Sequence, residues 1–522
     1  MKRTSMISFA LILFFLLNQC MAQPFNIRKF GAIPDNATIN TKYIQNAIDS
    51  CAASGGGTVY VPAGIFVTGT VILKSNVNLY LESGSQLKGS PNIADYKPYK
   101  SPIYNSDAHF GLIYASRAEN VSITGQGAIN GNDDVFFIWD QAKKIEWGGI
   151  EYTRQKSNFR SVQNGIGDGP VVPKPVRPGQ MIIFSECKNV LVRDIQLIKS
   201  PFWTLHFADC DGVIASGLKV WASMETPNSD GIDITSCNNV IVSDCDIRTG
   251  DDAIAITGYA YHFELPGFNN LRHISENITI SNCNLQSRSS GIRIGFLDQN
   301  TVRNIHIDNV NISDSNRGIG IFVRDEGSLE NLTIAQVTIH TRLHTGDWWG
   351  NGEPIHISAV RGKENVKLGT IKNLVFRDIT CIGENGILLY GSEESYIKGV
   401  LFDNLRFIFV NSKLNPVAGG NIDLRGAMGN RQLFSSDISA FYAQYVKDLK
   451  LNNVEISWGD VSDDYFTYGI HIREFSDLHW SDINASAAPS NVSLPAVFLE
   501  NGSMNKPNTG NGIIKTRNVK IK

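Results

Sequence analysis

Short apolar stretches that start with asparagine recur along the chain. Clear copies of the pattern Asn-apolar-x-apolar begin at Asn239, Asn277, Asn304, Asn331 and Asn373, and weaker ones at Asn120, Asn189, Asp211, Gly399, Asp448 and Asp477. Apolar and polar residues alternate within each copy, which predicts short strands. A unit of mostly 22 to 29 residues cannot bury its own apolar face. Stacked copies therefore predict a right-handed parallel β-helix, an all-β solenoid, with the asparagines in a ladder at one turn.

One segment has a helical period instead. Thr41–Ala53 carries Ile44, Ala47 and Ile48 at the spacing of an amphipathic helix, and Gly55-Gly56-Gly57 follows. We expect this helix to cover the N-terminal end of the coil.

Aligning the copies gives a register for one face of the coil. Two positions are predicted to point inward, namely Ile232, Ile254, Ile292 and Ile319, and then Ile234, Ile256, Ile294 and Ile321. The position between them points outward and holds Asp233, Ala255, Arg293 and Gly320. Just before this strand, one column holds Asp230, Asp252, Ser290 and Arg317.

Two acidic motifs lie on this face. Asn228-Ser229-Asp230 and Gly250-Asp251-Asp252 are about one coil apart, so their carboxyls are expected to lie on adjacent coils. Crowded carboxyls push one another's pKa values apart, as an acid and a base acting together require. The alternative is that these aspartates only cap turns.

Length and charge limit the possible functions. The net charge of −3 over 522 residues argues against a nucleic-acid binder. Residues 1–22 resemble a cleaved signal peptide, whose apolar core is too short for a membrane span, so we expect a secreted or periplasmic protein. Lipid attachment at Cys20 is the alternative. We expect residues 23–522 to form one domain, a monomer, with a loop insertion at about 139–180.

Seven cysteines remain after cleavage, an odd number. Cys245 and Cys283 occupy equivalent positions of the repeat, so we expect stacked, buried free thiols rather than disulfides. No cluster of cysteine and histidine has the spacing of metal ligands, and we expect no cofactor.

With these motifs the chain resembles the polygalacturonase family, glycoside hydrolase family 28. The paired acidic motifs carry the resemblance, supported by Phe30-Gly31-Ala32, Val61-Pro62-Ala63-Gly64 and Ser200-Pro201-Phe202-Trp203. It implies inverting hydrolysis of pectin without a metal, with Asp251 as general acid and Asp230 and Asp252 as the pair that deprotonates water. Inversion would place the carboxyls ~6.5–9.5 Å apart.

Two departures from the family pattern bear on the substrate. Ser289-Ser290-Gly291 stands where the family has Gly-His-Gly, and Gly320-Ile321-Phe322 stands where it has Arg-Ile-Lys, which grips a galacturonate carboxylate. This resembles the rhamnogalacturonan-directed branches. Phe322 would then face an apolar side of rhamnose. Arg293 would hold a neighbouring carboxylate, or would instead pair with a neighbouring acid.

Further residues are candidates for substrate contact. Besides Arg293 and Phe322 they are Ser290, Arg317, Arg324, His206, Tyr390, Trp348 and Trp349. Adjacent exposed tryptophans commonly stack on sugar rings, but packing of the loop is the alternative. For His206 the alternative is a structural, hydrogen-bonded histidine.

Two other functions remain open. A β-helical lyase would need calcium and a basic residue as proton abstractor, and would release an unsaturated product. A non-catalytic carbohydrate-binding solenoid would bind polysaccharide without turnover.

Overall fold

The computed structural model describes residues 24–101, 106–143, 152–156, 159–160, 167–259, 274–429, 432–505 and 514–521. The predicted signal peptide and Cys20 lie outside these ranges, as does part of the 139–180 insertion. Within the described ranges, no helix has the length and apolar character needed to cross a membrane.

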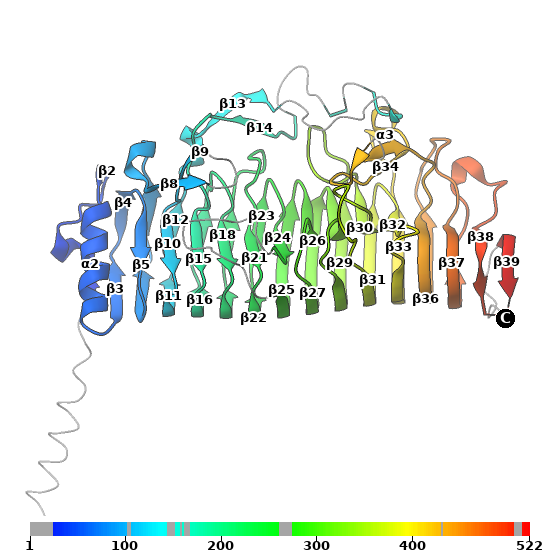
Figure 1. Cartoon of the computed structure of the whole chain (residues 1–522). Helices are drawn as coiled ribbons and strands as arrows, with labels where there is room; N and C mark the ends of the chain where they lie inside the picture. The colour runs from blue at the N-terminus through cyan, green and yellow to red at the C-terminus, as the bar shows by residue number, and fades with distance from the viewer. Residues whose placement is uncertain are drawn as a thin grey trace, which may run out of the picture.

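The chain folds into a right-handed parallel β-helix, as predicted (Figure 1). At its N-terminal end, β1 (Phe25–Asn26) stacks on β3 (Gly57–Val61) and β2 (Asp35–Ile39) stacks on β4 (Gly64–Thr68), with η1 (Ile27–Phe30) between β1 and β2. The column of strands that will carry the site consists of β5 (Val71–Leu73), β10 (Ile113–Ser116), β15 (Ile182–Ser185), β18 (Leu205–Ala208), β21 (Ile232–Thr235), β24 (Ile254–Thr257), β26 (Ser290–Phe296), β28 (Arg317–Val323), β30 (Glu353–Ala359) and β32 (Ile387–Tyr390).

Two further columns complete the early coils and merge into long bent strands in the later ones. The short strands are β6 (Val77–Leu81), β11 (Glu119–Gly125), β16 (Lys188–Arg193), β19 (Asp211–Ser216) and β22 (Asn238–Ser243), and β7 (Ser85–Gly89), β12 (Ala128–Asn130), β17 (Gln196–Ile198), β20 (Lys219–Trp221) and β23 (Asp246–Thr249). The long strands are β25 (Ser275–Ser287), β27 (Val302–Ser315), β29 (Leu329–Thr341), β31 (Ile371–Gly383), β33 (Ile397–Phe409), β36 (Phe441–Trp458), β37 (Ile470–Asn484), β38 (Val497–Met504) and β39 (Ile514–Ile521).

The predicted helix is α2 (Thr41–Ala53), with the same bounds. It buries Ile44, Ala47, Ile48 and Cys51 against the first coil, at the N-terminal end of the solenoid (Figure 1). Burying these side chains removes apolar surface from water at ~25 cal/mol per Å². The helix thus covers the apolar interior that an open coil would leave exposed.

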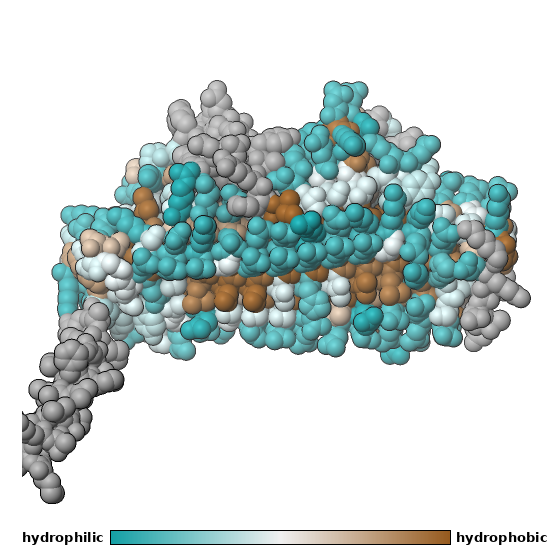
Figure 2. Space-filling view, turned by 60° about the horizontal axis from the view of Figure 1, so that its bottom comes forward, coloured by the Kyte–Doolittle hydropathy of each residue, from teal (hydrophilic) through white to brown (hydrophobic). Residues whose placement is uncertain are grey.

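The predicted register is confirmed. Ile232 pairs with Ile254, Ile254 with Ile292, and Ile292 with Ile319, and all four are fully buried. Equivalent positions therefore stack from coil to coil, and Figure 2 shows the result as hydrophilic and hydrophobic rows that run along the molecule.

The asparagine ladder is also present. The side-chain amide of Asn277 donates to Asn239, that of Asn304 to Asn277 and that of Asn331 to Asn304, over 3.3, 3.2 and 3.1 Å. These residues have φ near +60°, a left-handed conformation that asparagine tolerates better than most residues. Cys245 and Cys283 are buried free thiols, as expected.

The remaining elements lie along one side of the coil, at the top of Figure 1. They include three antiparallel pairs, β8 (Pro98–Ser101) with β9 (Ser106–His109), β13 (Phe137–Ala142) with β14 (Val171–Pro173), and β34 (Asn421–Asp423) with β35 (Leu433–Ser435). The short helices are η2 (Ile93–Asp95), η3 (Asp133–Val135), α3 (Asn415–Ala418) and η6 (Pro489–Asn491).

Candidate active site

The three aspartates lie in the turns that lead into β21 and β24. Asp230 stands two residues before β21, and Asp251 and Asp252 stand just before β24 on the next coil. All three are buried, with exposed fractions of 3, 7 and 3%. Adjacent parallel strands therefore bring them to one point on the coil.

The turn that carries Asp230 is tied to its neighbours. The Ser229 hydroxyl donates to the Thr226 carbonyl at 2.7 Å and accepts the Gly250 N–H at 3.0 Å. A Cβ at Gly250 would lie 2.2 Å from the Thr226 carbonyl oxygen, so only glycine permits this approach. Arg177 donates to the Asn228 side-chain oxygen at 2.8 Å. These contacts fix the position of the carboxyl that follows.

One oxygen of each carboxylate of Asp230, Asp251 and Asp252 lies within 4.8 Å of the others. This distance joins single oxygens, so the ~6.5–9.5 Å expected between the carboxyl groups stays a prediction. The oxygens lie close together because the Asp251 carboxylate accepts the Asn228 N–H at 3.2 Å and so leans toward the coil of Asp230. A water molecule can approach the carboxylates from the pocket. The spacing of the oxygens does not distinguish inversion from retention at the anomeric carbon.

Burial and crowding raise the pKa values of Asp230 and Asp251. Removal from water, then the neighbouring Asp252, raises the pKa of Asp251 to about 6. Burial and the charge of Asp251 raise the pKa of Asp230 well above its ordinary value. Asp233 lies beneath them on β21 and its pKa is raised as well, chiefly by burial. The site therefore favours protonated carboxyls, as a general acid requires.

Arg293 pairs with a carboxylate of the site and is therefore not available to hold a substrate carboxylate. Its Nε donates to the carboxylate of Asp252, and its Nη1 donates to the Gly295 carbonyl at 3.1 Å. The other Asp252 oxygen accepts the Ser290 N–H at 2.9 Å. Of the two sequence alternatives for Arg293, the structure thus supports pairing with a neighbouring acid. Ser290 is fully buried, and besides its backbone N–H its hydroxyl takes part by accepting from Arg317 Nη1 at 3.4 Å.

The aspartates open into a pocket of about 190 Å³. Its lining residues are Trp203, Asn228, Asp230, Asp251, Asp252, Tyr259, Arg293, Phe296, Arg317, Phe322, Arg324, Trp349, His356 and Arg425. Eight of the twelve predicted site residues are among them. Five of the lining residues lie on β26, β28 and β30, and the others lie in the turns and loops beside the strands.

Phe322 does not present a free apolar face. It is 5% exposed, and the guanidinium carbons of Arg317 and Arg324 lie 4.9 and 5.2 Å from its ring centre. The proposed contact with rhamnose through Phe322 is therefore not supported. Both arginines are buried beside the ring, which contacts two cations.

Besides Ser290, three predicted residues are absent from the pocket lining. His206 is fully buried beneath Trp203, whose ring centre is 5.2 Å from its own, and burial lowers its pKa to about 3. Tyr390 packs against the loop that contains β34 and β35. Trp348 is 2% exposed and donates its indole N–H to the Asp168 carbonyl at 3.0 Å. Trp349, its neighbour, is the one that lines the pocket.

Sequence reasoning missed six lining residues, Trp203, Asn228, Tyr259, Phe296, His356 and Arg425. His356 could have been predicted from the sequence, because it pairs with Gly320 and continues the outward column by one coil. Arg425 could not have been predicted, because its loop is not part of the repeat.

The same three carboxylates offer one oxygen each to a cation. Carboxylate oxygens are the ligands that Ca²⁺ and Mg²⁺ prefer. Arg293 already bonds one of them. A chelator test therefore belongs with any assay of this site.

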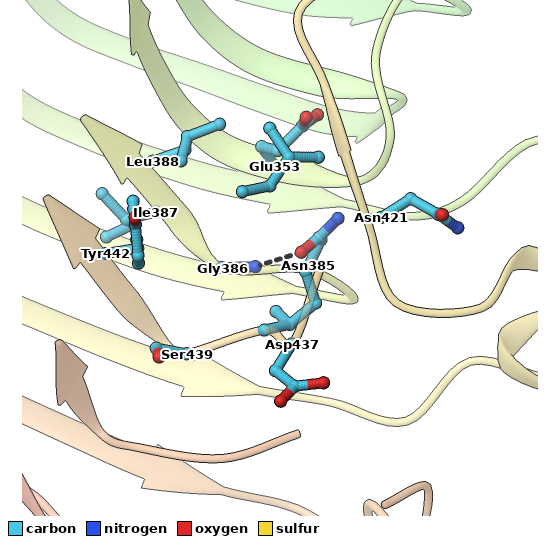
Figure 3. A pocket seen from close by; sticks show the side chains of 11 residues that line it. Glu353, Asn385, Gly386, Ile387, Leu388, Asn421, Asp437, Ser439 and Tyr442 are labelled. Atoms are coloured by element: carbon cyan, nitrogen blue, oxygen red, sulfur yellow. Dashed lines mark hydrogen bonds between the residues drawn. The ribbon is translucent and has the colours of Figure 1, made fainter. Parts of the chain in front are cut away.

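A second, much smaller pocket lies toward the C-terminal coils, lined by residues of β30, β32, β34 and β36 (Figure 3). It has a volume of about 20 Å³, which is room for about one water. Asn385, on the coil, donates to the Asn351 carbonyl at 2.7 Å, and Asn421, on the loop above, accepts from Asn351 at 3.2 Å through its carbonyl. The coil and the loop are therefore in close contact there.

Residues 173–342 match the family model described as "Glycosyl hydrolases family 28", and residues 24–167 match one described as "Rhamnogalacturonase A/epimerase, pectate lyase-like". Among curated proteins, the chain is 29% identical over 248 residues to a "Probable polygalacturonase" of Vitis vinifera, covering 45% of each chain. It is 29% identical over 254 residues to an "Exo-poly-alpha-D-galacturonosidase" of Dickeya chrysanthemi, covering 44% of this chain and 41% of that one. The match thus spans less than half the length of these relatives.

The solved structure of a family 28 exopolygalacturonase from Yersinia enterocolitica is similar to this fold. The TM-score is 0.62 at 20% identity, over 88% of this chain and 78% of that one. The likeness confirms the right-handed parallel β-helix, and the family match confirms the predicted resemblance over the segment that carries the aspartates.

Proposed function

We propose, from the relationship of residues 173–342 to glycosyl hydrolases family 28, that this protein is a secreted glycosidase that hydrolyses α-linked, galacturonate-containing pectin. The observation that carries the proposal is the cluster of Asp230, Asp251 and Asp252 within 4.8 Å, buried at the base of a pocket. Buried like charges cost free energy unless the site uses them. The relatives of known name support the substrate class.

In this mechanism Asp251 donates its proton to the glycosidic oxygen as the bond from that oxygen to the anomeric carbon breaks. A water held by Asp230 and Asp252 gives one proton to the carboxylate of Asp252, which is paired with Arg293, as the water oxygen forms the new bond to the same carbon. Asp251 suits its role because its pKa of about 6 keeps much of it protonated in mildly acidic solution. Arg293 holds Asp252 in place and balances one of the charges.

We propose inversion at the anomeric carbon, on the family resemblance alone, and action without a metal. Proton NMR of the first product decides the stereochemistry. Release of the β-anomer from an α-linked substrate indicates inversion, and release of the α-anomer refutes it.

A second candidate is action on rhamnogalacturonan. It is favoured by Gly320-Ile321-Phe322 in place of Arg-Ile-Lys, and by the match of residues 24–167 to a rhamnogalacturonase-type model. The decisive experiment is incubation with homogalacturonan and, separately, with rhamnogalacturonan I, followed by identification of the products. Products with a 4,5-unsaturated sugar would indicate a lyase. Tight binding without any product would indicate a non-catalytic solenoid.

A further inference from the structure

Loops close the pocket on the side toward the C-terminal coils. We call residues 342–352 and 410–429 the wall. Trp349 and Arg425, one from each segment, line the pocket on that side. Arg425 lies over the Trp349 ring, with its guanidinium carbon 5.2 Å from the ring centre. The ring edge of Trp349 also meets Phe296 of β26, at 5.7 Å between centres.

The wall is held by buried ion pairs. Arg425 donates from Nε to both Asp423 oxygens at 3.0 Å and from Nη1 to Asp347 at 2.8 Å. Arg160, from the 139–180 insertion, reaches Asp423 at 3.3 Å. The four side chains are at most 4% exposed. Removing one partner of a buried pair typically costs ~3–5 kcal/mol, so the wall is a fixed part of the structure.

A small apolar core adds to this fixation. Phe159 of the insertion packs with Leu343 and Ala418, one from each segment of the wall. All three side chains are buried. Segments far apart in the sequence therefore form one unit above β28 to β32, in the region of α3 and β34 at the top of Figure 1.

Beneath the wall, the described residues leave little room for a sugar chain. The pocket behind it, in Figure 3, has room for about one water. The main pocket, at about 190 Å³, is smaller than the ~300–1,000 Å³ of pockets for drug-sized ligands. It suits a single sugar ring beyond the scissile bond.

The end of the pocket next to the wall is cationic. Arg324 is 1% exposed and donates to the Ser358 carbonyl and hydroxyl at 3.1 and 2.9 Å. Among the described residues, no carboxylate lies within 4.0 Å of its guanidinium, and its Nε has no hydrogen-bond partner. Burial and the charge of Arg317 lower the pKa of Arg324 to about 9. A buried cation without a counter-ion favours an anionic ligand.

We propose that the site takes the end of a pectic chain, with one terminal uronate between the aspartates and the wall and its carboxylate at Arg324, beside Arg317, whose Nε already lies 3.8 Å from Glu353. The enzyme then removes sugars singly, and the remaining chain extends away from the wall. This inference rests on the proposed function and names its mode of attack.

The first test follows the products of size-defined oligogalacturonates labelled at the reducing end, and of rhamnogalacturonan oligosaccharides, while only a small share has reacted. The expected products are one monosaccharide and the chain shortened by one. A mixture of internal fragments from the start, with a rapid fall in viscosity of the polymer, would overturn the proposal.

Binding separates failure of the inference from failure of the proposed function. The Asp251→Asn variant is titrated with uronans of increasing length at equal mass. At equal mass, chains that are tenfold longer offer about tenfold fewer ends. A site that binds chain ends should therefore need about tenfold more mass of the longer chains for half-saturation. Length-independent binding, together with hydrolysis by the unaltered protein, would refute only the chain-end site. Absence of both binding and hydrolysis would refute the proposed function and this inference with it.

The role of Arg324 is tested with substrates whose terminal carboxylate is reduced to an alcohol. The Arg324→Gln variant lacks the charge that would pair with the terminal carboxylate. Its KM for the acidic substrate should therefore be about 30-fold higher or more. On the reduced substrate the variant and the unaltered protein should be equal. Arg406→Gln, which removes an exposed guanidinium paired with Glu455 at 3.1 Å, serves as the matched control. An equal loss on both substrates would mean that Arg324 only supports the fold.

Discussion

Replacing Asp251 by asparagine should abolish activity and, at neutral pH, stabilise the protein. General acid catalysis contributes ~10²–10⁴-fold, so turnover should fall by at least that factor. The stability effect follows from the raised pKa. Folding disfavours the ionised Asp251 carboxylate, because it is buried beside Asp252.

The size and sign of this effect follow from the pKa values. The ordinary value is 3.8 and the folded value is about 6. At ~1.36 kcal/mol per pKa unit, this difference corresponds to about 3 kcal/mol. The stability that the protonated group contributes is present below pH ~4 and is lost as the pH rises through ~6. Asparagine does not ionise and so has no such loss. Its side chain has one oxygen in place of two, however, so one of the two bonds that the Asp251 carboxylate accepts, from the N–H of Asn228 or of Asp252, is lost at a cost of ~1 kcal/mol.

The variant should therefore be about 2 kcal/mol more stable than the unaltered protein near pH 7.5, and about 1 kcal/mol less stable near pH 4. Thermal unfolding at both pH values shows whether the variant or the unaltered protein has the higher midpoint temperature. Asp211→Asn is the matched control. Its side chain is an exposed rung of the ladder, 2.8 Å from Asn239, where asparagine also occurs on other coils. A midpoint that falls steeply at both pH values with activity retained would show that Asp251 is only a turn residue.

Three further outcomes are expected. Activity should fall as the pH rises above about 6, because Asp251 loses the proton that it must donate; a rate that still increases up to pH 8 would contradict this assignment. Arg293→Gln should lower kcat ~10²-fold or more, with a smaller change in KM, because it leaves Asp252 buried without its partner; Arg303→Gln, from the half-exposed pair with Glu276, should leave kcat unchanged. Prolonged treatment with EDTA should leave the rate unchanged, and restoration of a lost rate by Ca²⁺ would show that the carboxylates hold a metal.

The fold and the position of the acids could be predicted because both depend on local periodicity. The repeat fixes which side chains stack, so the column of Asp230, Asp252, Ser290 and Arg317 followed from counting residues. The close approach of the carboxylate oxygens did not follow, because it depends on how Asp251 bends toward Asn228. The periodicity of the sequence predicts the coil on which a side chain lies. It does not predict the direction in which that side chain points.

The wall could not be predicted from the repeat. Arg160 donates to the Trp348 carbonyl and to Asp423, residues 188 and 263 positions away in the sequence. Such contacts belong to loops, in which no pattern recurs. For the same reason Trp348 and Trp349 were indistinguishable in the sequence, although one is packed within the loop and the other lines the pocket.

The division of the site between coil and wall has a consequence for its evolution. The aspartates and Arg293 lie on or next to strands whose spacing the stacked coils impose, whereas the wall consists of insertions that coils can gain or lose. Shortening the wall would lengthen the accessible surface without moving a catalytic atom. Within such a scaffold, the preference for chain ends or chain interiors can change by insertion and deletion, and the reaction itself is inherited unchanged.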